Sequence, residues 1–306
     1  MSPKDDPGGR MKGLFNLFGG KRAPAAKPGP AKRARATAPA RPRPTRETPT
    51  EGHRICVIGS SHMVAYKLAA DEMGARDGLY VHFQGMAGRE FAAIEARPKG
   101  VRVDPEKLLT DNRNARPMWN PLTDVIRYEE FDAFVVVGTL RTNYILSALY
   151  AHATSRAYTR GYIESGVEMM IERDHGVTLG RAIRKASGKP VVALAAPLPA
   201  IPVTVEDQAA MDAAYTDAIA LIESAFKERG LATLAQPVET VVDSSSTSER
   251  FARASQTLAG VAHEEEERVH MNLDFGMIAL PAILEAAGAP PRAVGPASGA
   301  LGSNAA

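Results

Sequence analysis

The stretch that decides the fold is FDAFVVVG, residues 131–138. An apolar run of this length that ends in glycine is typical of a strand buried on both faces of a sheet. Similar runs are HRICVIG at 53–59, LYVHFQG at 79–85 and PVVALAAP at 190–197, and a weaker one lies at 240–242. We therefore expect a sheet of about five strands.

Helical patterns separate these runs. They lie at 60–74, at 142–172 with a break near Gly161, and at 178–187, 205–229 and 272–287. Strands that alternate with helices predict a three-layer α/β/α sandwich with a mainly parallel, flavodoxin-like sheet. In such folds the functional site lies at the carboxyl ends of the strands, so the residues that directly follow each strand are the candidates.

Charge divides the chain of 306 residues into unequal parts. The net charge is +2, but residues 1–54 carry +9 and residues 55–306 carry −7. The composition predicts a disordered, basic, Pro/Ala-rich tail at 1–52, one α/β domain at 53–288 and a flexible C-terminal tail at 289–306. An acidic domain disfavours specific binding of nucleic acid.

The basic tail contains one apolar island, MKGLFNLF at 11–18. Two interpretations remain open: a weak anchor at an anionic membrane surface, or a solvated linker. The island is too short for a signal-peptide core, and no apolar stretch is long enough for a membrane-spanning helix. We expect a cytoplasmic protein, which would be membrane-peripheral under the first interpretation.

Residues that bind metals or nucleotides form no pattern in the sequence. A single cysteine, Cys56, excludes an intramolecular disulfide framework and a Cys-rich zinc site. There is no His-x-x-x-His pair, no dinucleotide-binding G-x-G-x-x-G motif and no P-loop. We expect neither a metal nor a cofactor.

Two short motifs carry the chemistry. The first strand leads into Gly59-Ser60-Ser61-His62, which places serines at the start of a helical segment. The free N–H groups of a helix start stabilise an oxyanion, although a serine there is also a common helix cap. Near the other end, ERVHMN at 267–272 sets an acid three residues before a histidine, and Phe275-Gly276 follows.

The order of these motifs resembles the SGNH hydrolase superfamily, also called GDSL-like esterases and lipases, over residues 53–288. The resemblance implies that Ser61 is the nucleophile, His270 the general base and Glu267 the acid that orients it. Gly85, in the second motif of the family, would donate a backbone N–H to the oxyanion. Asn272 matches the asparagine that often follows the histidine, and we include it among the substrate-binding candidates.

Three positions depart from the family pattern. Ser60 stands where the family has aspartate, and Glu267 replaces the usual aspartate, with Glu264–Glu266 as possible substitutes. The third motif, Gly-x-Asn, is here Gly138-Thr139-Leu140. The side-chain donor of the oxyanion hole would then be Asn143, Arg141 or absent.

The resemblance implies a serine ester hydrolase that forms an acyl-enzyme on small-molecule, carbohydrate or lipid esters. Two alternatives stay open. One is a catalytically decayed binding or scaffold protein on the same fold, and the other is an O-acyltransferase that uses the same site. Oligomeric state does not follow from the sequence.

Overall fold

The computed structural model describes residues 49, 51–86, 88–108, 125–156, 158–253 and 267–291. Nearly all of the predicted tails at 1–52 and 289–306 lies outside these residues, as does the apolar island at 11–18. The disorder of the tails and their membrane contact stay predictions.

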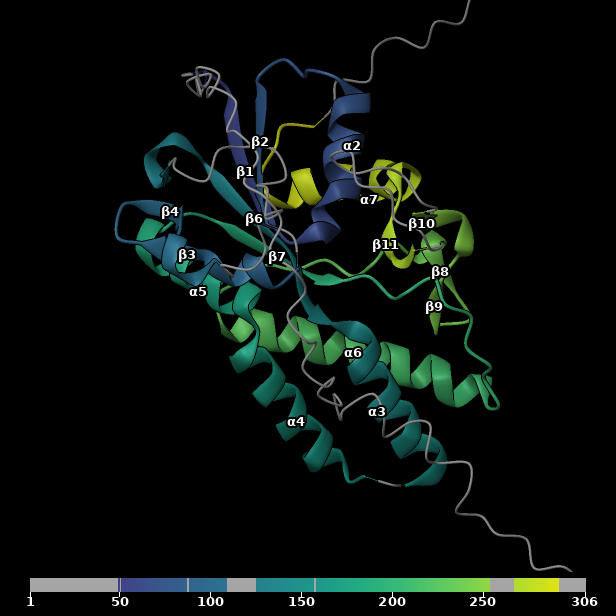
Figure 1. The fold of residues 1–306 in the computed structure, drawn as a ribbon. Coiled ribbons are helices and arrows are strands. Elements are labelled where there is room, and N and C mark those ends of the chain that lie inside the picture. Colours follow the sequence, from purple (N-terminus) through teal and green to yellow (C-terminus); the bar gives the residue numbers. More distant parts are fainter. Residues whose placement is uncertain are drawn as a thin grey trace, which may run out of the picture. The chain divides into compact units, whose positions relative to one another are not determined.

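A four-stranded parallel sheet forms the centre of the fold (Figure 1). Its strand order is β2-β1-β6-β7, with bounds Leu79–Gly85, His53–Gly59, Ala133–Arg141 and Val191–Ala196. Gly59 lies in register with Gly85 on one side and with Val137 on the other. The predicted α/β class is confirmed. Strands β1 and β2 end at the same level of the sheet, whereas β6 continues to Arg141, opposite the end of β7.

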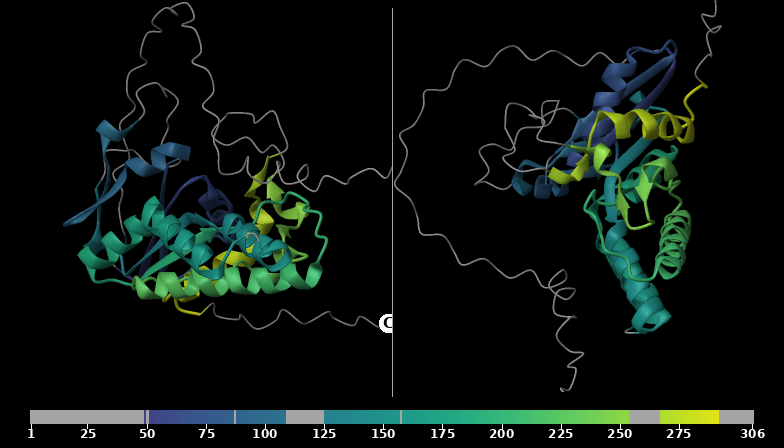
Figure 2. Two further views of the ribbon diagram at one scale, coloured as in Figure 1. Left: turned by 90° about the horizontal axis from the view of Figure 1, so that it is seen from below. Right: turned by 90° about the vertical axis from the view of Figure 1, so that its right-hand side faces the viewer.

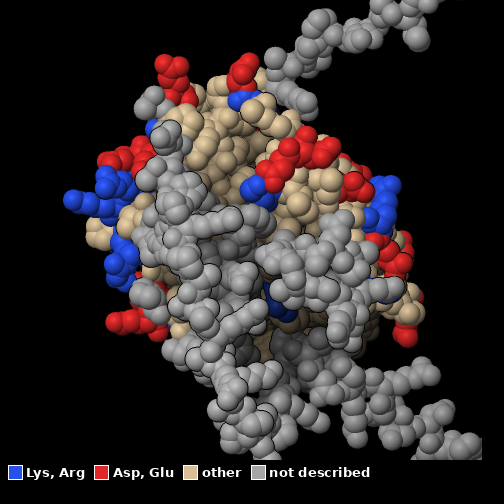
Figure 3. Space-filling view, turned by 45° about the horizontal axis from the view of Figure 1, so that its top comes forward, with Lys and Arg blue, Asp and Glu red and all other residues tan. Residues whose placement is uncertain are grey.

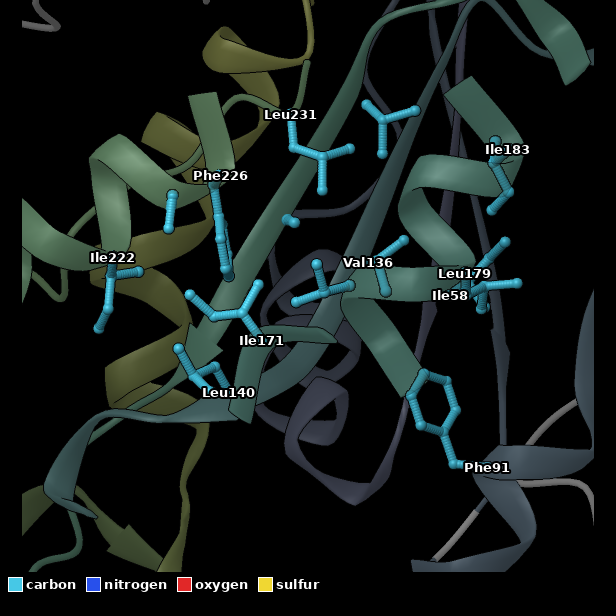
Figure 4. Packing of buried hydrophobic residues seen from close by; sticks show 14 of the residues in the cluster. Ile58, Phe91, Val136, Leu140, Ile171, Leu179, Ile183, Ile222, Phe226 and Leu231 are labelled. Atoms are coloured by element: carbon cyan, nitrogen blue, oxygen red, sulfur yellow. The ribbon is translucent and has the colours of Figure 1, made fainter. Parts of the chain in front are cut away.

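Two hydrophobic clusters cover the two faces of this sheet, because alternate strand residues point to opposite sides. Val57 and Val135 face one cluster, whereas Ile58 and Val136 face the other (Figure 4). The first cluster packs against helices α2 (Val64–Met73) and α7 (Leu273–Ala286). The second packs against α3 (Thr142–Ser155), α4 (Arg160–Arg173), α5 (His175–Ser187) and α6 (Gln208–Glu228) (Figure 2). The arrangement has the three layers that the sequence predicts.

The weak strand predicted at 240–242 does not join the main sheet, so this prediction was wrong. Val241–Val242 (β8) instead pairs with Ser246–Thr247 (β9) in an antiparallel hairpin. The turn between them has positive φ at Asp243 and Ser244, as tight hairpin turns require. The edge of β7 is met by Ala232, whose backbone exchanges hydrogen bonds of 2.8 and 3.0 Å with Ala193 and Val191.

Other elements complete the chain. The helical stretch predicted at 142–172 breaks slightly before Gly161, because Arg156 ends α3 in a left-handed conformation and Thr159 caps α4. The sequence did not predict the antiparallel sheet of β3 (Ile94–Arg97), β4 (Gly100–Val103) and β5 (Ile126–Arg127). Short 3-10 helices are η1 (Ser61–Met63), η2 (Gly88–Ala93), η3 (Pro105–Lys107), η4 (Tyr128–Glu130), η5 (Val238–Thr240) and η6 (Glu249–Phe251). Among the helices described, none has the length and apolarity needed to cross a bilayer.

Candidate active site

Ser61 lies at the carboxyl end of the central strand β1. The strand ends at Gly59, Ser60 stays extended, and η1 begins at Ser61. A Cβ atom at Gly59 would stand 3.0 Å from the Cβ of Val137, so a side chain there would crowd β6, and glycine avoids this contact. Met63, which is fully buried, anchors the turn and leaves Ser61 partly exposed at the edge of the sheet.

His270 reaches Ser61 from the far end of the sequence. The Oγ atom of Ser61 and the Nε2 atom of His270 are 2.5 Å apart and form a hydrogen bond between residues 209 positions apart. His270 belongs to β11 (Glu267–Met271), which pairs with β10 (Ala252–Arg253). Arg253 pairs with Glu267, and the preceding residue, Ala252, pairs with Met271, so residues 268–270 form a bulge. Such bulges re-aim side chains near functional sites.

Asn272 holds the chain directly after the histidine. Its Oδ1 accepts a hydrogen bond of 3.1 Å from the Phe275 backbone N–H and thereby caps α7. Its Nδ2 donates to the backbone carbonyls of Arg250 and Ala252, at 2.7 and 3.3 Å. These contacts fix the path of β11, so Asn272 supports the position of His270 through the fold.

Two further predicted site residues are placed by their backbones. Gly85 ends β2 in register with Gly59, and the next backbone N–H, of Met86, donates to the Gly59 carbonyl at 3.2 Å. Gly85 therefore lies at the same sheet edge as the turn that carries Ser61. Glu267 pairs with Arg253 through its strand, but its side chain lies outside the described part of the structure, as do Glu264–Glu266.

The end of β6 contains Gly138-Thr139-Leu140, the stretch compared above with the third SGNH motif. The pairing of β6 with β7 shifts register twice between Val137 and Arg141. Leu140 turns into the hydrophobic cluster between the sheet and the helices, where it is 2% exposed (Figure 4). Arg141 is exposed at the strand end, and Asn143 lies partly buried in the first turn of α3. The position that holds asparagine in the family is thus part of the core here.

His62 is a member of the site that sequence reasoning did not select. Its ring centroid is 4.8 Å from that of His270. Burial lowers the pKa of His62 from 6.5 to about 3, and the positive charges of His270 and Arg141 lower it further in the same direction. His62 is therefore neutral at neutral pH. Its place directly after Ser61, in the short turn at the end of β1, was the available signal.

Two buried polar atoms beside the nucleophile lack hydrogen-bond partners within the described chain. They are the Oγ of Ser60 and the Nδ1 of His62. Both residues contact Gly138, which has a φ of 74°. A Cβ atom there would stand 2.3 Å from the Ser60 Oγ and 3.1 Å from the His62 Cδ2. The absence of a side chain at Gly138 makes room for this pair.

An apolar cavity of about 230 Å³ lies elsewhere, between α6, α7 and β7. Tyr66, Thr142 and Phe275 contribute to its wall, whereas Ser61 and His270 do not. It is therefore distinct from the site that contains the serine and histidine. In the ranges that the structure describes, no group of three or more His, Cys, Asp or Glu side chains is arranged to hold a metal ion.

Comparisons with known proteins give structural likeness only. No protein-family model and no curated protein matches the chain. An extracellular lipase from Streptomyces rimosus is similar with a TM-score of 0.35 and 12% identity, over 77% of this chain and 100% of the lipase. A catalytic mutant of the acetylxylan esterase Axe2 from Geobacillus stearothermophilus has a TM-score of 0.34 and 9% identity, over 80% of this chain and 98% of the esterase. An aryl esterase from M. smegmatis is similar with a TM-score of 0.31 and 12% identity, over 76% of this chain and 99% of the esterase. These TM-scores are low, and we base the function on the geometry of the site.

Proposed function

We propose that the protein is a serine ester hydrolase with Ser61 as its nucleophile. The observation that carries this proposal is the 2.5 Å hydrogen bond between the Ser61 Oγ and the His270 Nε2. A serine within hydrogen-bond reach of an imidazole, at the carboxyl end of a parallel strand, has the geometry of an activated nucleophile.

The proposed reaction has two halves. His270 accepts the Ser61 proton at Nε2 while Oγ attacks the ester carbonyl, and the tetrahedral intermediate collapses as His270 returns the proton to the leaving alcohol. Water then attacks the acyl-enzyme with His270 again as base, which releases the acid and restores Ser61. This cycle requires Nε2 to be the unprotonated nitrogen at the start, and Glu267 would hold that tautomer through Nδ1–H.

Backbone N–H groups are the proposed oxyanion donors. The N–H of Ser61 lies at the start of η1, where the first donors of a helix have no intrahelical acceptor. Gly85 would supply the second donor, from the neighbouring strand end. Asn143, in the first turn of α3, is the proposed side-chain candidate for a third donor. Losing one such donor typically lowers the rate about 10²- to 10³-fold.

The neutral state of His62 fits this chemistry. When His270 takes up the serine proton it becomes positively charged, and a second charged imidazole 4.8 Å away would oppose that step. Because burial keeps the pKa of His62 near 3, only His270 changes charge during turnover.

Hydrolysis of 4-nitrophenyl acetate and longer acyl esters tests the proposal. Ser61→Ala and His270→Gln should lower kcat/KM about 10³-fold or more, because each removes half of the nucleophile–base pair. Ser165→Ala on the exposed side of α4 is the matched control and should keep full activity. Undiminished turnover by Ser61→Ala would refute the site. A folded wild-type protein that cleaves none of these esters would favour the decayed binding protein.

A further inference from the structure

Arg141 lies at the carboxyl end of the strand next to the one that leads to Ser61. It is the last residue of β6, which runs beside β1, and it directly precedes α3. Three residues earlier in the same strand end, Gly138 packs against His62. The positive charge of Arg141 also contributes to the lowered pKa of His62, after burial and the charge of His270. His62 in turn lies against His270.

The guanidinium of Arg141 is held in place but not neutralised. Its Nη1 donates to the Tyr144 hydroxyl at 3.1 Å, and its Cζ is 5.7 Å from the Tyr144 ring centre. A guanidinium has five N–H donors, so most of them are left for a ligand. No carboxylate among the described residues pairs with it, whereas Arg54 pairs with Asp132 at 3.0 Å and Arg229 with Glu172 at 2.7 Å.

Arg141 lies where the backbone itself favours an anion. It is the N-cap residue of α3, whose first turn contains no acidic residue. The N-terminal end of a helix carries a partial positive charge, which favours anions and disfavours a cation. The N-terminal end of α3 and the guanidinium of Arg141 therefore both contribute positive potential at this end of the sheet. On the face shown in Figure 3, acidic and basic side chains of the described residues are interspersed.

We propose that Arg141 binds a negatively charged group of the substrate, so that the enzyme prefers esters with a carboxylate or phosphate near the scissile bond. This specificity rests on the proposed hydrolase function. A bidentate, charge-assisted contact is the mode in which arginine recognises either anion.

Paired esters that differ in charge test the proposal. On the acyl side, 4-nitrophenyl hemiglutarate is compared with 4-nitrophenyl valerate. On the alcohol side, 4-acetoxybenzoate and 4-acetoxyphenyl phosphate are compared with 4-methylphenyl acetate, which separates carboxylate from phosphate. Arg141→Gln should lower kcat/KM about 10- to 100-fold for at least one anionic ester, while its neutral counterpart changes less than about 3-fold. Arg141→Lys should retain part of the preference, because it keeps the charge and loses the bidentate geometry.

Arg102 on β4, which is also exposed, provides the matched control. Arg102→Gln should leave every ratio of anionic to neutral turnover unchanged. Equal losses on neutral and anionic esters in Arg141→Gln would overturn the proposal, since they would indicate an oxyanion donor instead. Unchanged turnover of all esters in Arg141→Gln would overturn it as well.

A binding measurement separates this proposal from the proposed hydrolase function. Calorimetric titration of the Ser61→Ala protein with 4-nitrophenyl hemiglutarate and 4-acetoxyphenyl phosphate needs no turnover. The dissociation constant of at least one should rise about 10-fold or more when Arg141→Gln is added. If wild-type protein cleaves no ester but this rise is found, the hydrolase function fails and the anion site stands. If Arg141→Gln does not weaken binding of either ester, the anion site is refuted.

Discussion

Replacing Gly138 with alanine should disturb both stability and activity. Gly138 has a φ of 74°, and an added Cβ would stand 2.3 Å from the Ser60 Oγ. The left-handed conformation costs a non-glycine residue about 1–2 kcal/mol. Relieving the overlap requires Ser60 to move by about an ångström, and overpacking of this kind costs about 1–3 kcal/mol more. We expect Gly138→Ala to lower the free energy of unfolding by about 2–5 kcal/mol.

Gly188 supplies the control for the backbone term. It has a φ of 69° at the end of α5, and a Cβ there would meet nothing within 4 Å. Gly188→Ala should therefore lose only about 1–2 kcal/mol. Urea unfolding at pH 7, followed by circular dichroism, measures both variants. Equal destabilisation of the two would refute the packing of Ser60 against Gly138.

Gly138→Ala should also lower the rate of ester hydrolysis. Ser60 directly precedes Ser61, so a shift of about an ångström in Ser60 displaces the nucleophile from His270. Misplacement of this size lowers rates about 10²-fold, and Gly188→Ala should leave the rate unchanged. Ester hydrolysis under conditions where both variants are folded measures this effect. A fully active Gly138→Ala protein would contradict the coupling between the two residues.

Three further predictions concern the histidine side of the site. His62 has a pKa lowered from 6.5 to about 3, so the free energy of unfolding should fall as pH drops from about 6.5 towards 3; His62→Phe should flatten this part of the pH–stability curve, and an unchanged curve would count against a buried neutral His62. Asn272→Ala should lose about 1–2 kcal/mol in urea unfolding and Asn272→Asp less, because aspartate keeps the cap acceptor; equal stability of Asn272→Ala and wild type would disprove the cap. Glu267→Gln should lower kcat about 10²- to 10⁴-fold while Glu266→Gln does not, and the reverse result would move the acid to the neighbouring residue.

The main sheet could be predicted from local sequence because its strands are buried on both faces. AFVVV at 133–137 and ICVI at 55–58 are continuous apolar runs, and such runs leave few alternatives once glycine ends them. The segment at 240–242 was wrongly predicted to be a strand of the main sheet, because its valines also suit a short hairpin. The positive φ angles of Asp243 and Ser244 form the turn of that hairpin. The small sheet of β3, β4 and β5 was missed because its strands are short and β5 has only two residues.

The site was predictable only where a motif fixes a residue at a strand end. Ser61 follows the first strand, and His270 lies just before the last helix, so both came from order along the chain. The roles around them depend on three-dimensional details. The register shifts in β6 that bury Leu140 and leave Arg141 at the edge have no sequence pattern of their own. The contact of His62 with His270 likewise depends on a bulge in β11.

The most direct test of a Ser61 nucleophile is covalent labelling with a fluorophosphonate probe, followed by intact-mass analysis and peptide mapping. An activated serine attacks the phosphorus and displaces fluoride, which leaves one phosphonyl group on Oγ. We predict a single adduct on Ser61 in the wild-type protein, much slower labelling in His270→Gln and none in Ser61→Ala. An adduct that persists in Ser61→Ala, or folded wild-type protein that stays unlabelled, would contradict the central claim.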